Sequence, residues 1–245
     1  MFGFKKIKNK SVRQYELISN SSPKSAMAEA YRTLRTNLGF AEMDQPCRSI
    51  LVSSTSPQDG KSTITSNLAV VMAQAGNKVI IVDCDLRKPV QHKIFQVDNS
   101  RGVTNCLLQK LDVEEVAHKG LVENLTVLTS GPIPPNPAEI LNSERTRSFW
   151  KSLLERYDYV FIDAPPVLAV TDASILSTQV DGVILVIRSA NTRIDLARQG
   201  KEQFAKANAR VIGVVLNQVN MSANDYQYYY YYSHESEPSS SRFSF

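Results

Sequence analysis

The sequence has few cysteines, no long apolar run and little net charge, and each of these absences excludes a class of protein. Its three cysteines, Cys47, Cys84 and Cys106, are scattered without metal-ligand spacing, so we expect them to pack as small hydrophobic side chains in a reducing cytoplasm. No apolar segment reaches the length of a membrane span, and no charged start with a long apolar stretch marks a secretory signal. The formal net charge of +4 over 245 residues does not indicate a nucleic-acid partner, which requires a clustered basic face.

The chemistry that is present centres on one polar loop, residues 53–63. The apolar run before it predicts a buried strand at 49–52, and the pattern after it predicts a helix at 64–75. A Gly-Lys-Ser loop between a strand and a helix is the context of a phosphate-binding loop, where backbone N–H groups and the helix N-terminus face the anion. The alternative is a simple polar turn.

We expect Lys61 to reach the β- and γ-phosphates of a nucleotide and the Ser62 hydroxyl to ligate Mg²⁺. Thr55 stands where such loops usually have their first glycine, so the match is partial. The residues expected to bind the nucleotide are Thr55, Ser56, Asp59, Gly60, Lys61, Ser62 and Thr63.

Two further apolar runs end in aspartate. The run 79–82 is typical of a parallel strand covered on both faces, and it leads into Asp83 and Asp85. The run 159–162 repeats the pattern and ends at Asp163. Because ligands bind at the carboxyl ends of parallel strands, we expect these carboxylates near the loop, with a cation to neutralise them. The alternative for Asp83 and Asp85 is a pair of exposed turn residues.

The remaining pattern alternates strands and helices, which predicts an α/β fold with a doubly wound, mostly parallel sheet. Residues 1–22 are polar and basic, and we expect a flexible segment there; residues 23–220 form the domain, and residues 221–245 form a flexible tyrosine-rich tail. Asn217, after the last strand, is expected to be a turn residue, with contact to a nucleotide base as the alternative. Further strands are expected at 124–130, 182–187 and 211–216, and further helices at 26–42, before 157, at 172–179 and at 194–207.

The helix expected at 26–42 has an apolar stripe that includes Ala30 and Leu38, and a polar face with Glu29, Arg32 and Arg35. Three-residue spacing places the charged residues on one side of the helix. The simplest interpretation is a solvated, salt-bridged face. The adjacent arginines also suit an acidic partner surface, because guanidinium groups pair well with carboxylates.

These motifs together resemble the bacterial tyrosine kinases (BY-kinases) that regulate capsule and exopolysaccharide synthesis, from about residue 25 onward. The family's Walker A motif is matched by residues 55–62, its Walker A′ motif by 80–85 with Arg87, and its Walker B motif by 160–163. Its Glu-x-x-Arg-x-x-Arg assembly motif is matched by Glu29, Arg32 and Arg35. Its tyrosine cluster is matched by Tyr226, Tyr228, Tyr229, Tyr230, Tyr231 and Tyr232.

The resemblance implies a P-loop NTPase fold related to partitioning ATPases, with ATP and Mg²⁺ as ligands. It implies that Lys61 contacts phosphates, that Ser62, Asp85 and Asp163 hold the metal, and that Asp83 orients or deprotonates the acceptor phenol. It further implies autophosphorylation of the tail, self-association into a ring, protein substrates and a cognate tyrosine phosphatase. The expected location is the cytoplasm, at the inner face of the membrane, through a transmembrane activator protein.

Two other functions remain open on the sequence. A partitioning-type ATPase switch usually has an extra lysine five residues before the loop lysine, and this chain has Ser56 there. A non-catalytic nucleotide-binding adaptor would not need the full set of Lys61, Asp83 and Asp163. The tyrosine run itself could be an aromatic contact patch instead of a set of phosphoacceptors.

Overall fold

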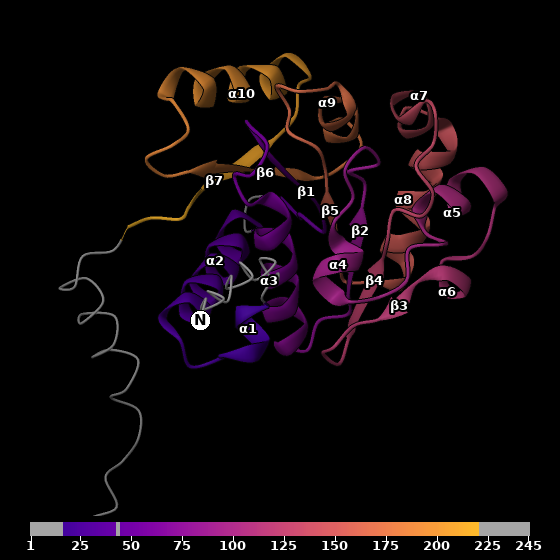
Figure 1. Ribbon diagram of the computed structural model, residues 1–245, viewed down its shortest axis with the longest axis horizontal. Coiled ribbons are helices and arrows are strands. Elements are labelled where there is room, and N and C mark those ends of the chain that lie inside the picture. Colours follow the sequence, from indigo (N-terminus) through magenta and orange to yellow (C-terminus); the bar gives the residue numbers. More distant parts are fainter. Residues whose placement is uncertain (1–16, 43–44, 221–245) are drawn as a thin grey trace, which may run out of the picture.

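A seven-stranded sheet forms the centre of the molecule, with helices on both of its faces (Figure 1). The computed structural model describes residues 17–42 and 45–220. The strand order is β3-β4-β2-β5-β1-β6-β7, and every neighbouring pair is parallel except β3 with β4. The predicted doubly wound, mostly parallel sheet is therefore confirmed.

The strands are β1 (Ser49–Ser54), β2 (Val79–Asp83), β3 (His118–Lys119), β4 (Leu125–Leu128), β5 (Tyr159–Asp163), β6 (Gly182–Arg188) and β7 (Val211–Asn217). The described helices are α1 (Ile18–Ser21), α2 (Ala26–Glu42), α3 (Lys61–Gln74), α4 (Gln91–Phe95), α5 (Val103–Gln109), α6 (Val113–Val116), α7 (Pro137–Leu141), α8 (Glu144–Arg156), α9 (Asp172–Ser177) and α10 (Ile194–Lys206).

Successive side chains along each strand point to opposite faces of the sheet, so the apolar core consists of two clusters, one on each face. In β1, Leu51 belongs to one cluster, whereas Ile50 and Val52 belong to the other. The cluster with Leu51 is closed by residues of α5 to α10, and the opposite cluster by Leu17 and residues of α2 to α4. The central strands β1 and β2 are thus buried on both faces, as parallel sheets require, whereas the edge strand β7 exposes Val214 and Leu216.

Most elements lie where the sequence places them, with a few differences in extent. The strand expected at 124–130 is limited to Leu125–Leu128, and the helix expected from residue 64 begins at Lys61. The apolar stripe of α2 was assigned wrongly at Ala30, which is exposed; Ala28 is buried instead. The three cysteines are free and buried, as expected.

The structure also differs from the expected flexible segment at residues 1–22. Leu17 is buried, and α1 packs on α3, where the Ser19 N–H donates to Asn67 Oδ1 at 3.0 Å. These contacts order residues 17–22, because a buried leucine and a paired backbone group both oppose fraying. The start of the basic segment and the tyrosine-rich tail lie outside the described residues.

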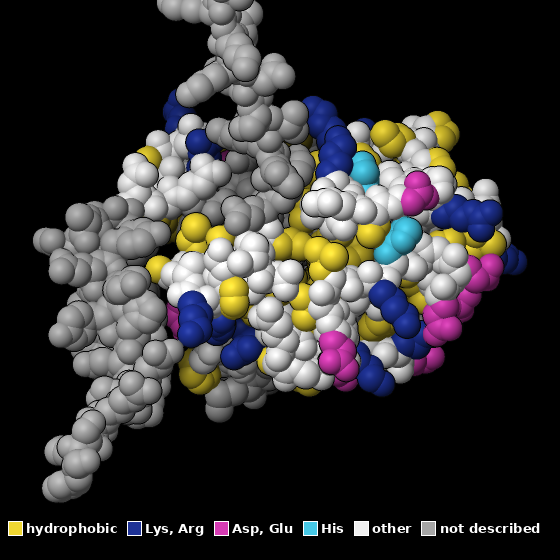
Figure 2. Space-filling model, turned by 60° about the horizontal axis from the view of Figure 1, so that its bottom comes forward, with side chains coloured by type: hydrophobic (Ala, Val, Ile, Leu, Met, Phe, Trp, Pro, Cys, Tyr) yellow, Lys and Arg dark blue, Asp and Glu magenta, His cyan; other side chains and the backbone are white. Residues whose placement is uncertain are grey.

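Within residues 17–42 and 45–220, none of the helices combines the length and apolar character that crossing a membrane requires. On the face drawn in Figure 2, Lys and Arg side chains lie among Asp, Glu and hydrophobic ones. The described residues of this face therefore show no continuous basic surface of the kind that nucleic acid binds.

Candidate functional site

The loop between β1 and α3 ends at a glycine that no other residue could replace without strain. Gly60 has a φ of +95°, and a Cβ atom added to it would lie 2.0 Å from Asn217 Nδ2. Helix α3 begins directly after Gly60 and has no side-chain cap. Its first backbone N–H groups thus remain available, and together with the positive end of the helix dipole they suit an anion.

The buried Asp59 holds this loop together through hydrogen bonds. Its carboxylate accepts hydrogen bonds from Thr55 Oγ1 (3.0 Å), the Ser56 N–H (2.9 Å) and Thr192 Oγ1 (3.1 Å). Asn217 Nδ2 donates to the Asp59 carbonyl oxygen at 2.8 Å. The structure therefore gives Asp59 and Thr55 a role in shaping the loop.

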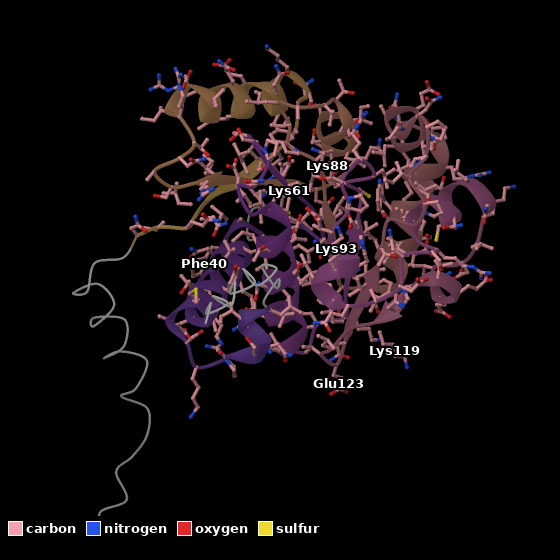
Figure 3. The ribbon with its side chains drawn as sticks, viewed as in Figure 1. Phe40, Lys61, Lys88, Lys93, Lys119 and Glu123 are labelled. Carbon is pink, nitrogen blue, oxygen red and sulfur yellow. The ribbon has the colours of Figure 1, made fainter. Side chains whose placement is uncertain are left out.

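Lys61 lies at the centre of the site, at the start of α3 and near the carboxyl ends of the central strands (Figure 3). Its Nζ lies 2.9 Å from Asp85 Oδ2, 3.3 Å from Asp163 Oδ1 and 3.2 Å from Ser62 Oγ. Burial lowers the pKa of the Lys61 ammonium, but the charges of Asp163 and Asp85 outweigh it and raise that pKa overall. Lys61 therefore stays charged and neutralises the carboxylates around it.

Asp83 lies beside Asp163, because the two residues are paired in the register of β2 and β5. Asp83 is fully buried, and its carboxylate accepts from the backbone N–H groups of Asp85, Val90 and Gln91. Burial, followed by the charge of Asp163, raises the pKa of Asp83 to about 8. Asp83 and Asp85 are thus not exposed turn residues, and that alternative is wrong.

Gln91 belongs to the site, although no motif in the sequence pointed to it. Its Nε2 donates to Asp163 Oδ2 at 2.8 Å, and its Oε1 accepts from Ser66 Oγ at 2.7 Å. The side chain is fully buried. Gln91 connects α4 to α3 and to β5, so it fixes the orientation of the Asp163 carboxylate.

The donor set around Lys61 fits Mg²⁺. Ser62 Oγ, Asp85 Oδ2 and Asp163 Oδ1 are all within 3.3 Å of one cationic atom. Over the described part of the chain, no group of three or more His, Cys, Asp or Glu side chains could hold a metal ion by itself. Magnesium in phosphate-transfer sites uses one or two carboxylates and takes its other ligands from substrate and water, which agrees with this set.

Two predicted motif residues make contacts that the sequence did not indicate. Arg87 forms a bidentate ion pair with the buried Asp172, at 2.9 and 3.1 Å, and this pair ties the segment after β2 to α9. Thr63 lies in the first turn of α3, where its carbonyl oxygen accepts from Asn67.

The charged face of α2 lies on the other side of α3. Arg32 pairs with Glu29 at 2.6 Å and also donates to the Pro23 carbonyl oxygen. Arg35 donates to the Val71 carbonyl oxygen of α3 at 3.1 Å. All three side chains are half-buried, so each has an intrachain contact and also an exposed part.

The comparisons with known proteins agree with one another. Residues 48–221 match a family model described as an AAA domain. The tyrosine-protein kinase YwqD of Bacillus subtilis (strain 168) is 43% identical over 223 residues, which are 90% of this chain and 94% of YwqD.

Two solved structures are also similar. The chimerical protein CapA2B2 has a TM-score of 0.81 and 43% identity, covering 84% of this chain and 90% of that one. The kinase domain of the Escherichia coli tyrosine kinase ETK has a TM-score of 0.81 and 32% identity, covering 85% of this chain and 82% of that one.

Proposed function

This chain belongs to the family of bacterial tyrosine-protein kinases, with an AAA-domain fold, and we propose that it transfers the γ-phosphoryl group of ATP to tyrosine side chains. The observation that carries the proposal is the position of Lys61 Nζ between Asp85, Asp163 and Ser62 at the start of α3. This arrangement places a cation, metal-binding oxygens and uncapped helix N–H groups around one point, as phosphoryl transfer requires.

The residues of the chain would then promote transfer mainly by positioning the phosphates and by stabilising their charge. On nucleotide binding, Lys61 exchanges its carboxylate partners for the β- and γ-phosphates, and the N–H groups after Gly60 bind the phosphate oxygens. Ser62, Asp85 and Asp163 would hold Mg²⁺, which neutralises charge on the phosphates when it is bound. Exclusion of water follows from burial, since Lys61 is only 9% exposed and Ser62 only 8%.

Asp83 is the candidate to orient the acceptor phenol or to take its proton. An unperturbed tyrosine has a pKa near about 10, so a carboxylate with a raised pKa is a suitable acceptor late in the transfer. The carboxylate is enclosed by its three backbone N–H donors. Access for a phenol therefore requires the segment from Asp85 to Gln91 to shift.

We further propose that the acceptors include the chain's own tail tyrosines, Tyr226 and Tyr228 to Tyr232. A tail that reaches a neighbouring subunit is held at an effective concentration of about the millimolar range. Each phosphate adds about −1.5 to −2 charges, so phosphates on adjacent tyrosines repel one another and oppose entry into an acidic site. The result would be a cycle between an assembled, unphosphorylated ring and dispersed, phosphorylated subunits.

The proposed partners follow the family. They are a transmembrane activator protein that recruits the kinase to the inner face of the membrane, protein substrates, and a cognate tyrosine phosphatase. The proposed cellular role is control of capsule or exopolysaccharide synthesis and export. Names such as CapB of Staphylococcus aureus, a putative tyrosine-protein kinase 38% identical to this chain, support the assignment to such a system.

Incubation of the purified chain with Mg-ATP, followed by detection of phosphotyrosine, tests this function directly. A kinase yields phosphotyrosine on the chain. A partitioning-type ATPase would release inorganic phosphate without phosphotyrosine, and an adaptor would bind nucleotide and do neither. Ser56, where the partitioning enzymes usually have lysine, favours the first result.

A further inference from the structure

A pocket opens beside the phosphoryl-transfer site, between α4 and the loop that follows β4. Its volume is about 630 Å³, within the range of small-ligand sites. It lies at the carboxyl ends of β2 and β4, the edge of the sheet where α/β proteins bind ligands. The lining residues are Arg87, Lys88, Pro89, Val90, His92, Lys93, Asn99, Gly131, Pro132 and Ile133.

The pocket is cationic on one wall and apolar on the other. Lys88 and Lys93, which Figure 3 labels after β2 and on α4, are exposed and form no ion pair with a described residue. No Asp or Glu is among the lining residues. Val90, Pro132 and the 63% exposed Ile133 supply the apolar wall. An aromatic ring that carries an anionic group matches both walls.

Backbone hydrogen bonds shape both sides of the pocket. On one side, the Lys88 N–H donates to Asp85 Oδ1 at 3.0 Å, and the Val90 N–H donates to Asp83 Oδ2 at 3.0 Å. On the other side, Asn99 Oδ1 accepts from the Gly131 N–H at 3.0 Å. In the structure without ligand, these hydrogen bonds join one side of the pocket to Asp83 and Asp85 and the other side to Asn99.

A single carboxylate separates the pocket from the transfer site. Asp85 contacts Lys61 Nζ through Oδ2 and the Lys88 N–H through Oδ1. In an extended peptide, residues i and i+2 point to the same side and lie about 7 Å apart. An extended peptide with one tyrosine at the transfer site would therefore direct the tyrosine two residues away toward the side of Asp85 on which the pocket lies.

We propose that this pocket binds the phosphotyrosine of an acceptor peptide that has already been phosphorylated once, and so positions the next tyrosine of the run for transfer. The proposal rests on the proposed kinase function. The ring would pack on Val90, Pro132 and Ile133, and the phosphate would pair with Lys88 and Lys93. A phosphate of about −1.5 to −2 charges matches these two ammonium groups.

Binding is tested with the full-length chain whose tail tyrosines are replaced by phenylalanine, so that its own tail does not compete. The probes are labelled peptides of residues 222–238, either unphosphorylated or with phosphotyrosine at position 230, measured by fluorescence anisotropy. Saturating Mg-ADP fills the phosphate-binding loop. We expect the phosphopeptide to bind about tenfold more tightly, because charge-assisted hydrogen bonds form only with the phosphate.

The decisive variant is Lys88→Gln with Lys93→Gln, which keeps the Lys88 N–H bond to Asp85. Its matched control is Lys119→Gln with Lys151→Gln, the same charge change at exposed lysines of β3 and α8. The first should lose the tenfold preference and the control should keep it. The proposal is overturned if the wild type binds both peptides equally or if Mg-ADP abolishes its preference for the phosphopeptide. It is also overturned if the first variant keeps that preference or if the control variant loses it to the same extent.

A second measurement separates this proposal from the kinase function itself. Mass spectrometry follows a peptide with one tyrosine and a peptide with the full tyrosine run. The Lys88→Gln, Lys93→Gln variant should phosphorylate the first at the wild-type rate and accumulate singly phosphorylated forms of the second. Absence of any transfer by the wild type would refute the kinase function, whereas the anisotropy result would stand on its own. Wild-type product distributions from the variant would refute the positioning role.

Discussion

Asp83 and Asp163 are register partners on adjacent parallel strands, so two carboxylates stand side by side at the end of the sheet. Among the described residues, only Lys61 forms an ion pair with Asp163. The Asp83 carboxylate instead accepts hydrogen bonds from backbone N–H groups. The two acids are therefore equivalent in the sequence pattern but differ in their partners. This difference gives the predictions for the site.

Replacement Lys61→Met should abolish tyrosine phosphorylation, because a thioether cannot bind phosphate. It should also destabilise the protein without ligand, by about 3 kcal/mol, because the buried Asp163 loses its cationic partner. Mg²⁺ should restore part of that stability by replacing the ammonium. Phosphotyrosine detection and thermal unfolding with and without Mg²⁺ measure both effects. Lys151→Met, at an exposed site, is the control, and wild-type phosphorylation by Lys61→Met would contradict the assignment.

Replacements Asp83→Asn and Asp163→Asn should fail for different reasons. Asp83→Asn should keep nucleotide affinity and lose transfer, and it should lose about 1–3 kcal/mol of stability, because an amide NH₂ must face a buried N–H. Asp163→Asn should weaken Mg²⁺-dependent nucleotide binding. Titration calorimetry with Mg-ADP separates the two. Equal losses of binding in both variants would refute this division of roles.

The pH dependence of stability should show the buried Asp83. Its pKa in the folded protein is raised to about 8, against about 3.9 in an unfolded chain, so the folded state retains a proton that the unfolded state releases. This contribution is complete below about pH 4 and is lost as pH rises through about 8. Denaturant unfolding without Mg²⁺ and nucleotide should therefore show stability falling over this window. A curve of the same slope in Asp83→Asn would exclude Asp83 as the cause.

Simultaneous replacement of Glu29, Arg32 and Arg35 by alanine should disrupt self-association. A contact that repeats head to tail closes into a ring, and charge pairs at its edge should weaken with salt. Light scattering measures the mass of the assembly. Because Arg32 and Arg35 also bond within their own chain, circular dichroism must show a folded variant. A folded triple variant with the wild-type mass would count decisively against the assembly role.

Removal of residues 226–232 should leave ATP binding intact, remove most autophosphorylation and keep the subunits assembled. The reason is that the deletion removes the acceptors and the charge that would disperse the ring. Mass spectrometry of the intact chain locates the phosphates, and light scattering follows the assembly. Phosphates found mainly on Tyr15, Tyr31 or Tyr157 would require the tail mechanism to be abandoned.

The sequence by itself determined the elements that bear the site. Apolar runs that end in Asp83 and Asp163, and a loop that ends in Gly60-Lys61-Ser62, encode strand ends and a helix start through local preferences, so each could be located without knowing its neighbours. The same local reasoning gave the parallel sheet, because strands buried on both faces alternate with helices. It misjudged Ala30 and residues 17–22, because the buried side of a helix and the order of a terminal segment both depend on what packs against them.

The tertiary structure alone decided which groups meet. Gln91 and Asp163 are 72 residues apart, and Asn217 and Asp59 are 158 residues apart, yet each pair shares a hydrogen bond. The contact between Gln91 and Asp163 results from the register of β2 with β5 and from the packing of α4. Neither can be recognised from the residues next to Gln91 or Asp163 in the sequence. Buried polar groups need hydrogen-bond partners, and the fold decides which residues are near enough to provide them. The sequence therefore shows the reactive groups of the site, whereas long-range packing determines which residues orient them.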